Sequence, residues 1–460
     1  GIHSALPGSS GRIRATRRTS CVTDQPLPGA YWRLWFAAAI SNLGDGVFVI
    51  ALSLLATRIT DSPLSIGLIA TFATIPWMLF ALPVGVIIDR VDRRKVLVIA
   101  DLSRGVLVGG LAVVAAFWDV QIWMLWLLAF GLGVGEVFFD NGAQTILPAI
   151  VPRDQLERAN GYFSAAEVTT NTFLGMPLGG ALIAFAVWLP FGVDAASFVV
   201  AALLAASLRG SFRPTNSVPS TGMIDDMRGG LRWLLGHRLL RTLALVVTVM
   251  NLAFATTQAT FVLFAQQELH ISDNAFGPLL AVIGAGSLLG GIIGGKVVGL
   301  FGRRASMLTA ALTPVFTSTA IALWPVTWFV IAMITVQAFA TTVGSILSVS
   351  LRQQIVPGQL FGRVNSIYRW FSTGAMPLGA LLGGVLATAF GLRAPYFAAA
   401  ALLLIASLLV ATGLTNAALS AALTQYSPVT TEPTFATDVD TDDTPVSIDR
   451  DPLDDLLAGP

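Results

Sequence analysis

The sequence predicts an all-α polytopic membrane protein, and three observations lead to that fold class. Hydrophobic residues make up 55% of the 460 residues and charged residues only 12%, about half the charged share of a soluble domain. The mean hydropathy is +0.75. Apolar runs of about 20 residues, long enough to cross the hydrocarbon layer as helices, recur along nearly the whole chain. A chain of this composition does not dissolve in water as one globule.

The apolar runs predict twelve transmembrane helices, each end placed to within several residues. We expect them at residues 33–57, 64–88, 96–117, 121–146, 161–188, 192–208, 240–267, 275–299, 305–325, 327–350, 366–390 and 394–414. When these spans alternate across the bilayer, nearly all the loop cations fall on one face, and only Arg58 and Arg393 fall on the other. Because loop cations gather on the cytoplasmic side, we expect a multi-pass protein of the cell membrane with both termini in the cytoplasm.

Changes in composition divide the chain into five parts. A basic tail at residues 1–32 precedes a six-helix bundle at 33–208, and no cleavage pattern of a signal peptide follows the tail. A polar linker at 209–239 leads to a second six-helix bundle at 240–414. The acidic tail at 415–460 contains few apolar residues and is expected to be disordered in the cytoplasm.

The two predicted bundles repeat one another in sequence. "VPRDQLERAN", after the fourth span, aligns with "VPGQLFGRVN", after the tenth. "GMPLGGAL" in the fifth span likewise aligns with "GALLGGVL" in the eleventh. A pair of parallel six-helix repeats with a substrate path between them is the architecture of a secondary transporter.

A charged turn follows the second span in the stretch "GVIIDRVDRRK". Its residues Gly85, Asp89, Arg90, Arg93, Arg94 and Lys95 match the signature of the major facilitator superfamily, which the chain resembles over about residues 31–414. The turn departs from the signature at Asp92, where glycine is usual. That departure, together with "SNLGDG", "EVFFDNGAQTILPAIVP" and "FGLRAPY", resembles the enterobactin-exporter and macrolide-efflux branch. The resemblance implies two pseudo-symmetric six-helix bundles in the major facilitator fold.

The same resemblance implies that the charged turn is a conformational latch. Asp89 is expected to meet the N-terminus of the eleventh span, where free amide groups favour an anion. Gly85 lets the two backbones approach, and one of the cations Arg90, Arg93 and Arg94 is expected to reach Asp140 on the fourth span. The alternative is a plain turn whose cations only anchor it on the cytoplasmic side.

Ionisable residues inside the spans are costly and are therefore candidate functional sites. Asp45 lies 12 residues beyond Arg33, about 18 Å along the helix and near the bilayer midplane. We predict that Asp45 and Glu136 take part in proton coupling; the alternative for Asp45 is a permanent hydrogen bond to a neighbouring helix. Further charges are interpreted mainly as structural: Asp101 and Arg104 as a mutually neutralising pair, Asp194 as an interfacial residue, and Glu167 as either structural or functional.

The fifth span carries a glycine and proline motif formed by Gly175, Pro177, Gly179 and Gly180. Proton-driven drug exporters of the superfamily carry a similar element with the proline one position earlier. Glycine and proline together kink a helix and let a neighbour pack closely. The motif favours export over import, although close packing without directional meaning is an open alternative.

Several classes of protein lack support in the sequence. The three histidines His3, His237 and His270 lie outside the spans, and neither the zinc-protease motif H-E-x-x-H nor the phosphate-binding motif G-x-x-x-x-G-K-[ST] occurs. With Cys21 as the single cysteine, no disulfide within the chain is possible. We therefore expect no enzyme activity, no cofactor, no metal site and no nucleic-acid partner.

The predicted function is secondary active transport, namely proton-coupled export of an amphipathic or lipophilic small molecule by a monomer in the lipid bilayer. A siderophore or lysophospholipid transporter of the same fold is an open alternative. A non-transporting membrane receptor or scaffold is another.

Overall fold

The computed structural model is helical throughout the part of the chain that it describes, which comprises residues 26–88, 91–152, 155–208, 212, 223–356 and 358–415. The described residues leave out nearly all of the predicted tail at 415–460, most of the predicted N-terminal tail at 1–32, part of the predicted linker at 209–239, and Asp89 and Arg90 of the charged turn. Within the described part, twelve helices are long and apolar enough to cross a membrane, so the predicted number of spans is confirmed.

The N-terminal half contains the first six spans, the fifth of which is built from three segments. The helices are α1 (Gly29–Ile59), α2 (Pro63–Ile88), α3 (Arg93–Phe117), α4 (Ile122–Ile150), α5 (Leu156–Glu167), η2 (Val168–Gly175), α6 (Met176–Phe185) and α7 (Leu189–Ala206). The segment η2 is a π-helix that joins α5 to α6. Such wide turns are rare and are often found at functional sites.

The C-terminal half contains the other six spans, the additional helix α8 and two short segments, α10 and η3. Its helices are α8 (Met223–Gly236), α9 (Arg238–Gln258), α10 (Phe261–Gln267), η3 (Asp273–Ala275), α11 (Phe276–Phe301), α12 (Arg303–Leu323), α13 (Thr327–Ile355), α14 (Gly358–Gly374), α15 (Met376–Phe390) and α16 (Ala394–Gly413). The seventh span is interrupted between α9 and α10, and the eleventh between α14 and α15.

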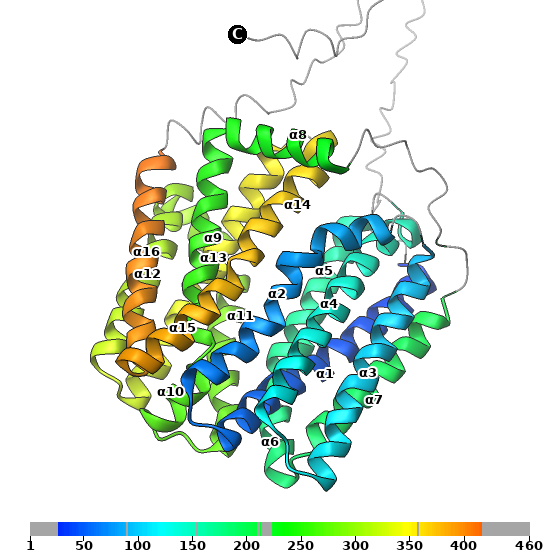
Figure 1. Cartoon of the computed structure of the whole chain (residues 1–460). Helices are drawn as coiled ribbons and strands as arrows, with labels where there is room; N and C mark the ends of the chain where they lie inside the picture. The colour runs from blue at the N-terminus through cyan, green and yellow to red at the C-terminus, as the bar shows by residue number, and fades with distance from the viewer. Residues whose placement is uncertain are drawn as a thin grey trace, which may run out of the picture.

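The two halves stand side by side as separate bundles (Figure 1). In the N-terminal half α1 and α3 pack on α7, and α2 packs on α4; in the C-terminal half α16 packs on α9 and α12, and α11 packs on α13. The halves meet mainly through α2 against α15 and through α6 against α11. The arrangement follows the sequence repeat, since equivalent helices occupy equivalent places in each bundle.

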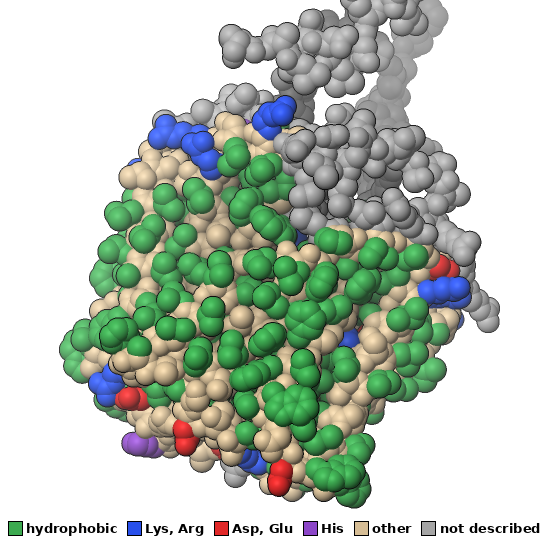
Figure 2. All heavy atoms as spheres, viewed as in Figure 1, with side chains coloured by type: hydrophobic (Ala, Val, Ile, Leu, Met, Phe, Trp, Pro, Cys, Tyr) green, Lys and Arg blue, Asp and Glu red, His purple; other side chains and the backbone are tan. Residues whose placement is uncertain are grey.

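Apolar side chains cover most of the outer surface. In Figure 2 they form a broad band, with Lys and Arg at the end where α8 lies and further charged side chains at the other end. Large exposed side chains in the spans include Val106, Phe185, Leu300 and Phe390. A band of this kind, bounded by charged residues, is the surface that a bilayer covers.

We use two names for the ends of the molecule. The terminal face is the end where α1 begins and α16 ends, and the opposite face is the end that carries the α1–α2 connection (Figure 1). At the opposite face the halves are joined: Arg58 Nη2 lies 2.7 Å from Asp273 Oδ2, and the Leu64 amide donates to Thr388 Oγ1 at 3.1 Å. The two halves are therefore closed against each other at this face.

The helix α8 lies across the terminal face of the C-terminal half (Figure 1). It packs on α14 and α9 and buries Leu234, while Arg232 and Leu235 are exposed. This segment falls within the predicted linker, for which the sequence analysis expected no helix.

Candidate functional site

The centre of the N-terminal half contains an ion pair between α1 and α3. Arg104 Nη2 donates to Asp45 Oδ1 at 2.5 Å, and the two side chains are 4% and 25% exposed, respectively. The pair is inside the protein, yet the Asp45 carboxylate keeps an accessible side. Asp45 is thus the more accessible member of the pair.

Two further carboxyl groups surround the same guanidinium. Asp101 Oδ1 lies 3.8 Å from Arg104 Nη1 on the same helix, and Asp194 on α7 acts electrostatically on Arg104. The Arg104 Cζ atom stacks 4.2 Å from the centre of the Phe198 ring, also on α7. A single cation therefore faces Asp45, Asp101 and Asp194, from three helices.

This network is only partly satisfied by hydrogen bonds. Asp101 and Asp194 are both 0% exposed. Both carboxylate oxygens of Asp101, Asp194 Oδ2 and Arg104 Nε have no hydrogen-bond partner in the described part of the chain, although Asp194 Oδ1 accepts from Ser197 Oγ at 3.3 Å. An unmade buried hydrogen bond costs about 1–3 kcal/mol, so this arrangement is not optimised for stability.

The structure changes two interpretations made from the sequence. Arg104 is not paired with Asp101 alone, because its short contact is with Asp45. Asp194, which was expected near the membrane interface, is fully buried between helices. The reason is that α7 packs tightly on α1 and α3, which places Asp194 beside Gly44, where a Cβ atom would collide with Asp194 Oδ1.

Glu136 on α4 belongs to the edge of the same charged region. Its carboxylate accepts a hydrogen bond from the Trp77 side chain on α2 and acts electrostatically on Arg104. The Glu136 side chain is exposed rather than packed away. Glu136 and Asp45 thus share Arg104 as a cation but approach it from different helices.

A second charged group spans the two halves. Asp140 on α4 and Glu167 on α5 both interact electrostatically with Arg369 on α14. The Arg369 Cζ atom lies 5.2 Å from the Trp77 ring centre, and the next residue, Trp370, donates from Nε1 to the Met78 carbonyl at 2.9 Å. Arg369 therefore connects the C-terminal half to acidic and aromatic residues of the N-terminal half; the sequence analysis did not single it out.

The charged turn after α2 is described from Val91 onward. Asp92 is the N-cap of α3 and accepts from the Arg94 amide at 3.1 Å. Arg94 Nη1 donates to the Leu208 carbonyl, beyond the end of α7, at 2.8 Å. Gly85 lies in the last turns of α2, and the predicted contacts of Asp89 and Arg90 lie outside the described residues. The latch is therefore still a prediction.

The glycines of the fifth span bring three helices together. A Cβ atom at Gly175 would lie 2.7 Å from the Leu43 carbonyl oxygen and 2.8 Å from Gly46 Cα on α1. Gly179 also faces α1, at Val47 and Ile50, whereas Gly180 approaches Gly277 on α11. Pro177 stands in the first turn of α6. The motif thus packs η2 and α6 against the part of α1 that carries Asp45.

No group of histidine, cysteine or acidic side chains that could hold a metal ion is present among the described residues. The charged groups of the two clusters described above are carboxylates and guanidiniums, which can form and exchange ion pairs. Covalent chemistry is not needed for either process.

Comparison with known proteins gives consistent matches. The family described as transmembrane secretion effector matches residues 25–451. The multidrug efflux pump Tap of Mycolicibacterium fortuitum is 28% identical, over 79% of this chain and 90% of Tap. Macrolide efflux protein A of Streptococcus pyogenes is 24% identical, over 79% of this chain and 90% of that protein.

Among solved structures, a bacterial homologue of the human lysosomal transporter Spinster, in its inward-facing and occupied conformation, aligns with a TM-score of 0.67. The alignment covers 84% of this chain and 96% of that one at 16% sequence identity. A bacterial homologue of the iron transporter ferroportin in an inward-facing state aligns with a TM-score of 0.64 at 18% identity, over 84% of this chain and 99% of that one. These likenesses establish the fold.

Proposed function

This chain belongs to the transmembrane secretion effector family of the major facilitator superfamily, and we propose that it exports an amphipathic small molecule in exchange for protons. Its relatives are named as multidrug and macrolide efflux pumps, which supports efflux by alternating access. No cofactor or metal ion enters the proposed mechanism.

The observation that carries the proton coupling is the contact between Asp45 and Arg104. The single positive charge of a guanidinium balances the charge of one carboxylate. Asp45 makes the short contact with Arg104, and Asp101 and Asp194 interact with it more weakly. A proton that binds Asp45 removes its charge and weakens this ion pair. Arg104 is then drawn to the remaining carboxylates. Protonation of Asp45 thereby causes the ion pairs inside the N-terminal half to rearrange.

Helix α1 offers a direct path from that rearrangement to the contact between the halves. Asp45 is flanked by Gly44 and Gly46, which touch α7 and η2, and the same helix ends at Arg58, which is paired with Asp273 of the other half. A shift of α1 would therefore move Arg58 and weaken the ion pair that closes the opposite face. Glu136, which shares Arg104 with Asp45, is the second proton-coupling candidate.

Alternating access requires that the two faces open in turn. The contacts at the opposite face, Arg58 with Asp273 and Leu64 with Thr388, must break when that face opens. We propose that the charged turn after α2 then closes the terminal face as a latch, through Asp89 and the cations Arg90, Arg93 and Arg94, with Asp140 as the acidic partner. The terminal face is the cytoplasmic one, because nearly all loop cations lie there.

The test is proton release from the reconstituted protein. The purified full chain is placed in liposomes with a pH-sensitive dye, and amphipathic drugs, siderophores and lysolipids are added one class at a time. The proposal expects proton movement that depends on the substrate, for at least one amphipathic drug. Binding of these compounds without any proton movement would contradict the coupling, and a lack of any response would favour a receptor.

A further inference from the structure

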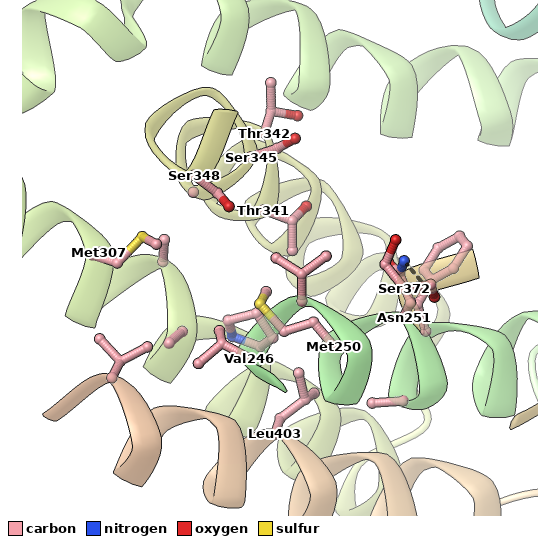
Figure 3. Close-up of a pocket in the computed structure, with 18 of the residues that line it drawn as sticks. Val246, Met250, Asn251, Met307, Thr341, Thr342, Ser345, Ser348, Ser372 and Leu403 are labelled. Atoms are coloured by element: carbon pink, nitrogen blue, oxygen red, sulfur yellow. Dashed lines mark hydrogen bonds between the residues drawn. The ribbon is translucent and has the colours of Figure 1, made fainter. Parts of the chain in front are cut away.

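A cavity of about 480 Å³ lies within the C-terminal half, between α9, α12, α13, α14 and α16 (Figure 3). Its size is that of a small-molecule site. The ion pair between Asp45 and Arg104 belongs to the other half. The cavity is therefore separate from that ion pair.

One wall of the cavity is a stripe of hydroxyl groups on α13. Thr341, Ser345 and Ser348 stand at helical positions i, i+4 and i+7 and so share one face. The stripe is about 10 Å long, from seven residues of helical rise. Figure 3 shows these side chains along a single helix, with Val246 and Met250 of α9 across the cavity.

Three polar groups that line the cavity each use a hydrogen within the protein. Thr341 Oγ1 donates to the Gln337 carbonyl at 2.9 Å, and Thr342 Oγ1 donates to the Ala338 carbonyl at 2.8 Å. Asn251 Nδ2 donates to the Ser372 carbonyl at 3.0 Å. The two threonine oxygens still offer lone pairs to a ligand, and the amides of Asn251 and Gln337 carry further N–H donors. A ligand hydroxyl suits this mixed lining because it both donates and accepts.

The other walls are apolar. Val246 and Met250 come from α9, Met307 from α12 and Leu403 from α16. Methionine side chains adapt to ligands of irregular shape because they are unbranched and flexible. The cavity therefore has one polar edge lined by hydroxyl groups and a broad apolar surface.

Charge at the cavity comes from two arginines, and no carboxylate is among the described residues that line it. Arg352 is in the last turn of α13, and its Cζ atom stacks 4.1 Å from the Tyr368 ring centre. Arg369 stacks on Trp77 and interacts with the acidic residues of the N-terminal half. The two guanidiniums disfavour a cationic ligand, and the interaction of Arg369 with Asp140 and Glu167 leaves less of its charge for an anion.

We propose that this cavity binds a neutral amphipathic molecule whose polar edge carries hydroxyl groups, in the manner of a sugar-bearing lipophile. The proposal rests on the proposed function in one respect, since it makes this chamber the cargo site of the exporter. Cargo and proton then bind in different halves. Proton binding in one half then affects cargo binding in the other through the contacts that join the halves.

Three probes with the same octyl tail test the proposal by their head groups. Octyl glucoside carries hydroxyl donors, octyltrimethylammonium is a cation without donors, and octyl sulfate is an anion with acceptors only. Each is titrated calorimetrically, below its micelle concentration, into the full chain in lipid nanodiscs, and the heat with empty nanodiscs is subtracted. We expect the glucoside to bind about tenfold more tightly than the other two. Equal binding of all three, or tightest binding of the sulfate, would overturn the proposal.

Matched variants locate the binding. The double variant Thr341→Val and Ser345→Ala removes two hydroxyls from the stripe, and we expect about tenfold weaker glucoside binding with no change for the cation. Thr319→Val is the control, because Thr319 also donates to its own helix, at Val315, but does not line the cavity. Thermal unfolding of both variants checks that they fold. An unchanged glucoside affinity in a folded double variant would place the site elsewhere.

The variant Asp45→Asn separates this proposal from the proposed function. It should still bind the glucoside through the hydroxyl stripe, with an affinity that no longer changes with pH, even though proton-driven export fails. Loss of glucoside binding in Asp45→Asn would contradict separate chambers. Continued proton-driven export in Asp45→Asn, with binding still dependent on Thr341 and Ser345, would overturn the coupling role of Asp45 and leave the cavity assignment standing.

Discussion

Arg58, in the last turn of α1, and Asp273, in η3, join the two halves of the molecule through an ion pair of 2.7 Å at the opposite face. Asp273 is also held by Gln266, whose Nε2 donates to Asp273 Oδ1 at 2.8 Å. The contact is partly exposed, with side chains 36% and 28% accessible. It therefore contributes to closure without making closure permanent.

Removing this pair should open the opposite face more often. A partly exposed ion pair contributes about 0.2–1 kcal/mol, so we expect Arg58→Gln to raise the open population by a factor of about 1.4 to 5. The measurement is the distance distribution between spin labels placed on the two halves at that face. Arg393→Gln is the matched control, since Arg393 pairs with Glu268 at 2.7 Å within the C-terminal half. Equal opening in both variants would show that the pair across the halves has no special role.

The approach of η2 to α1 should not tolerate a side chain. Gly175→Ala places a methyl group against the Leu43 carbonyl and Gly46, and we expect a loss of about 1–3 kcal/mol, typical of overpacking. The readout is the melting temperature in detergent together with transport. Gly161→Ala, in α5, is the control because a Cβ atom there meets open space. If the two variants melt alike, α1 and η2 are less tightly packed than the structure indicates.

Asp92 stands where the superfamily signature has glycine, and the structure supplies a reason. As the N-cap of α3 it accepts from the Arg94 amide. Asp92→Ala should lower the free energy of unfolding by about 1 kcal/mol, whereas Asp92→Asn and Asp92→Gly should cost only a few tenths. Thermal unfolding of the three variants gives the order. A larger loss in Asp92→Asn than in Asp92→Ala would point to the charge, and thus to a role beyond capping.

The geometry of Arg104 should matter as much as its charge. Its guanidinium contacts Asp45 on one side and stacks on Phe198 on another, which a lysine ammonium cannot reproduce. We expect Arg104→Lys to lower gradient-driven transport at least about tenfold, and Arg104→Gln to impair both transport and folding because it leaves Asp45 without a cation. Flux in liposomes and the yield of folded protein separate these effects. Arg393→Lys, at an exposed pair, serves as the control. Normal transport by Arg104→Lys would remove the guanidinium from the mechanism.

Hydropathy was enough to predict the twelve spans, since apolar runs of sufficient length leave few alternatives in a membrane. The partner of Asp45 was not predictable in the same way, because Arg104 lies 59 residues away and on another span. Because Asp194 stands near the start of the predicted span at 192–208, it was expected near the membrane interface. Its burial depends instead on how α7 packs against α1 and α3.

The hydroxyl stripe and helix α8 were missed for related reasons. Thr341, Ser345 and Ser348 look like ordinary small polar residues until α9 and α16 are placed opposite them. Helix α8 is short and lies within a polar segment, so its signal is weak beside those of the spans. An amphipathic pattern around Leu231, Trp233 and Leu234 was the available clue.

The central claim is that Asp45 carries the exchanged proton, and Asp45→Asn tests it most directly. The amide keeps the shape of the side chain but cannot release a proton, so the driving step fails while the rest of the site is preserved. Asp119→Asn is the control, because Asp119 is exposed in the α3–α4 connection.

The measurement is substrate flux driven by a pH gradient in liposomes, with an amphipathic drug that the wild type exports, paired with binding affinity from about pH 5 to 9. We predict that Asp45→Asn binds the drug with a flattened pH profile and exports none of it uphill, while Asp119→Asn behaves as wild type. Uphill export by Asp45→Asn with the wild-type pH profile would contradict the account and transfer the proton role to Glu136.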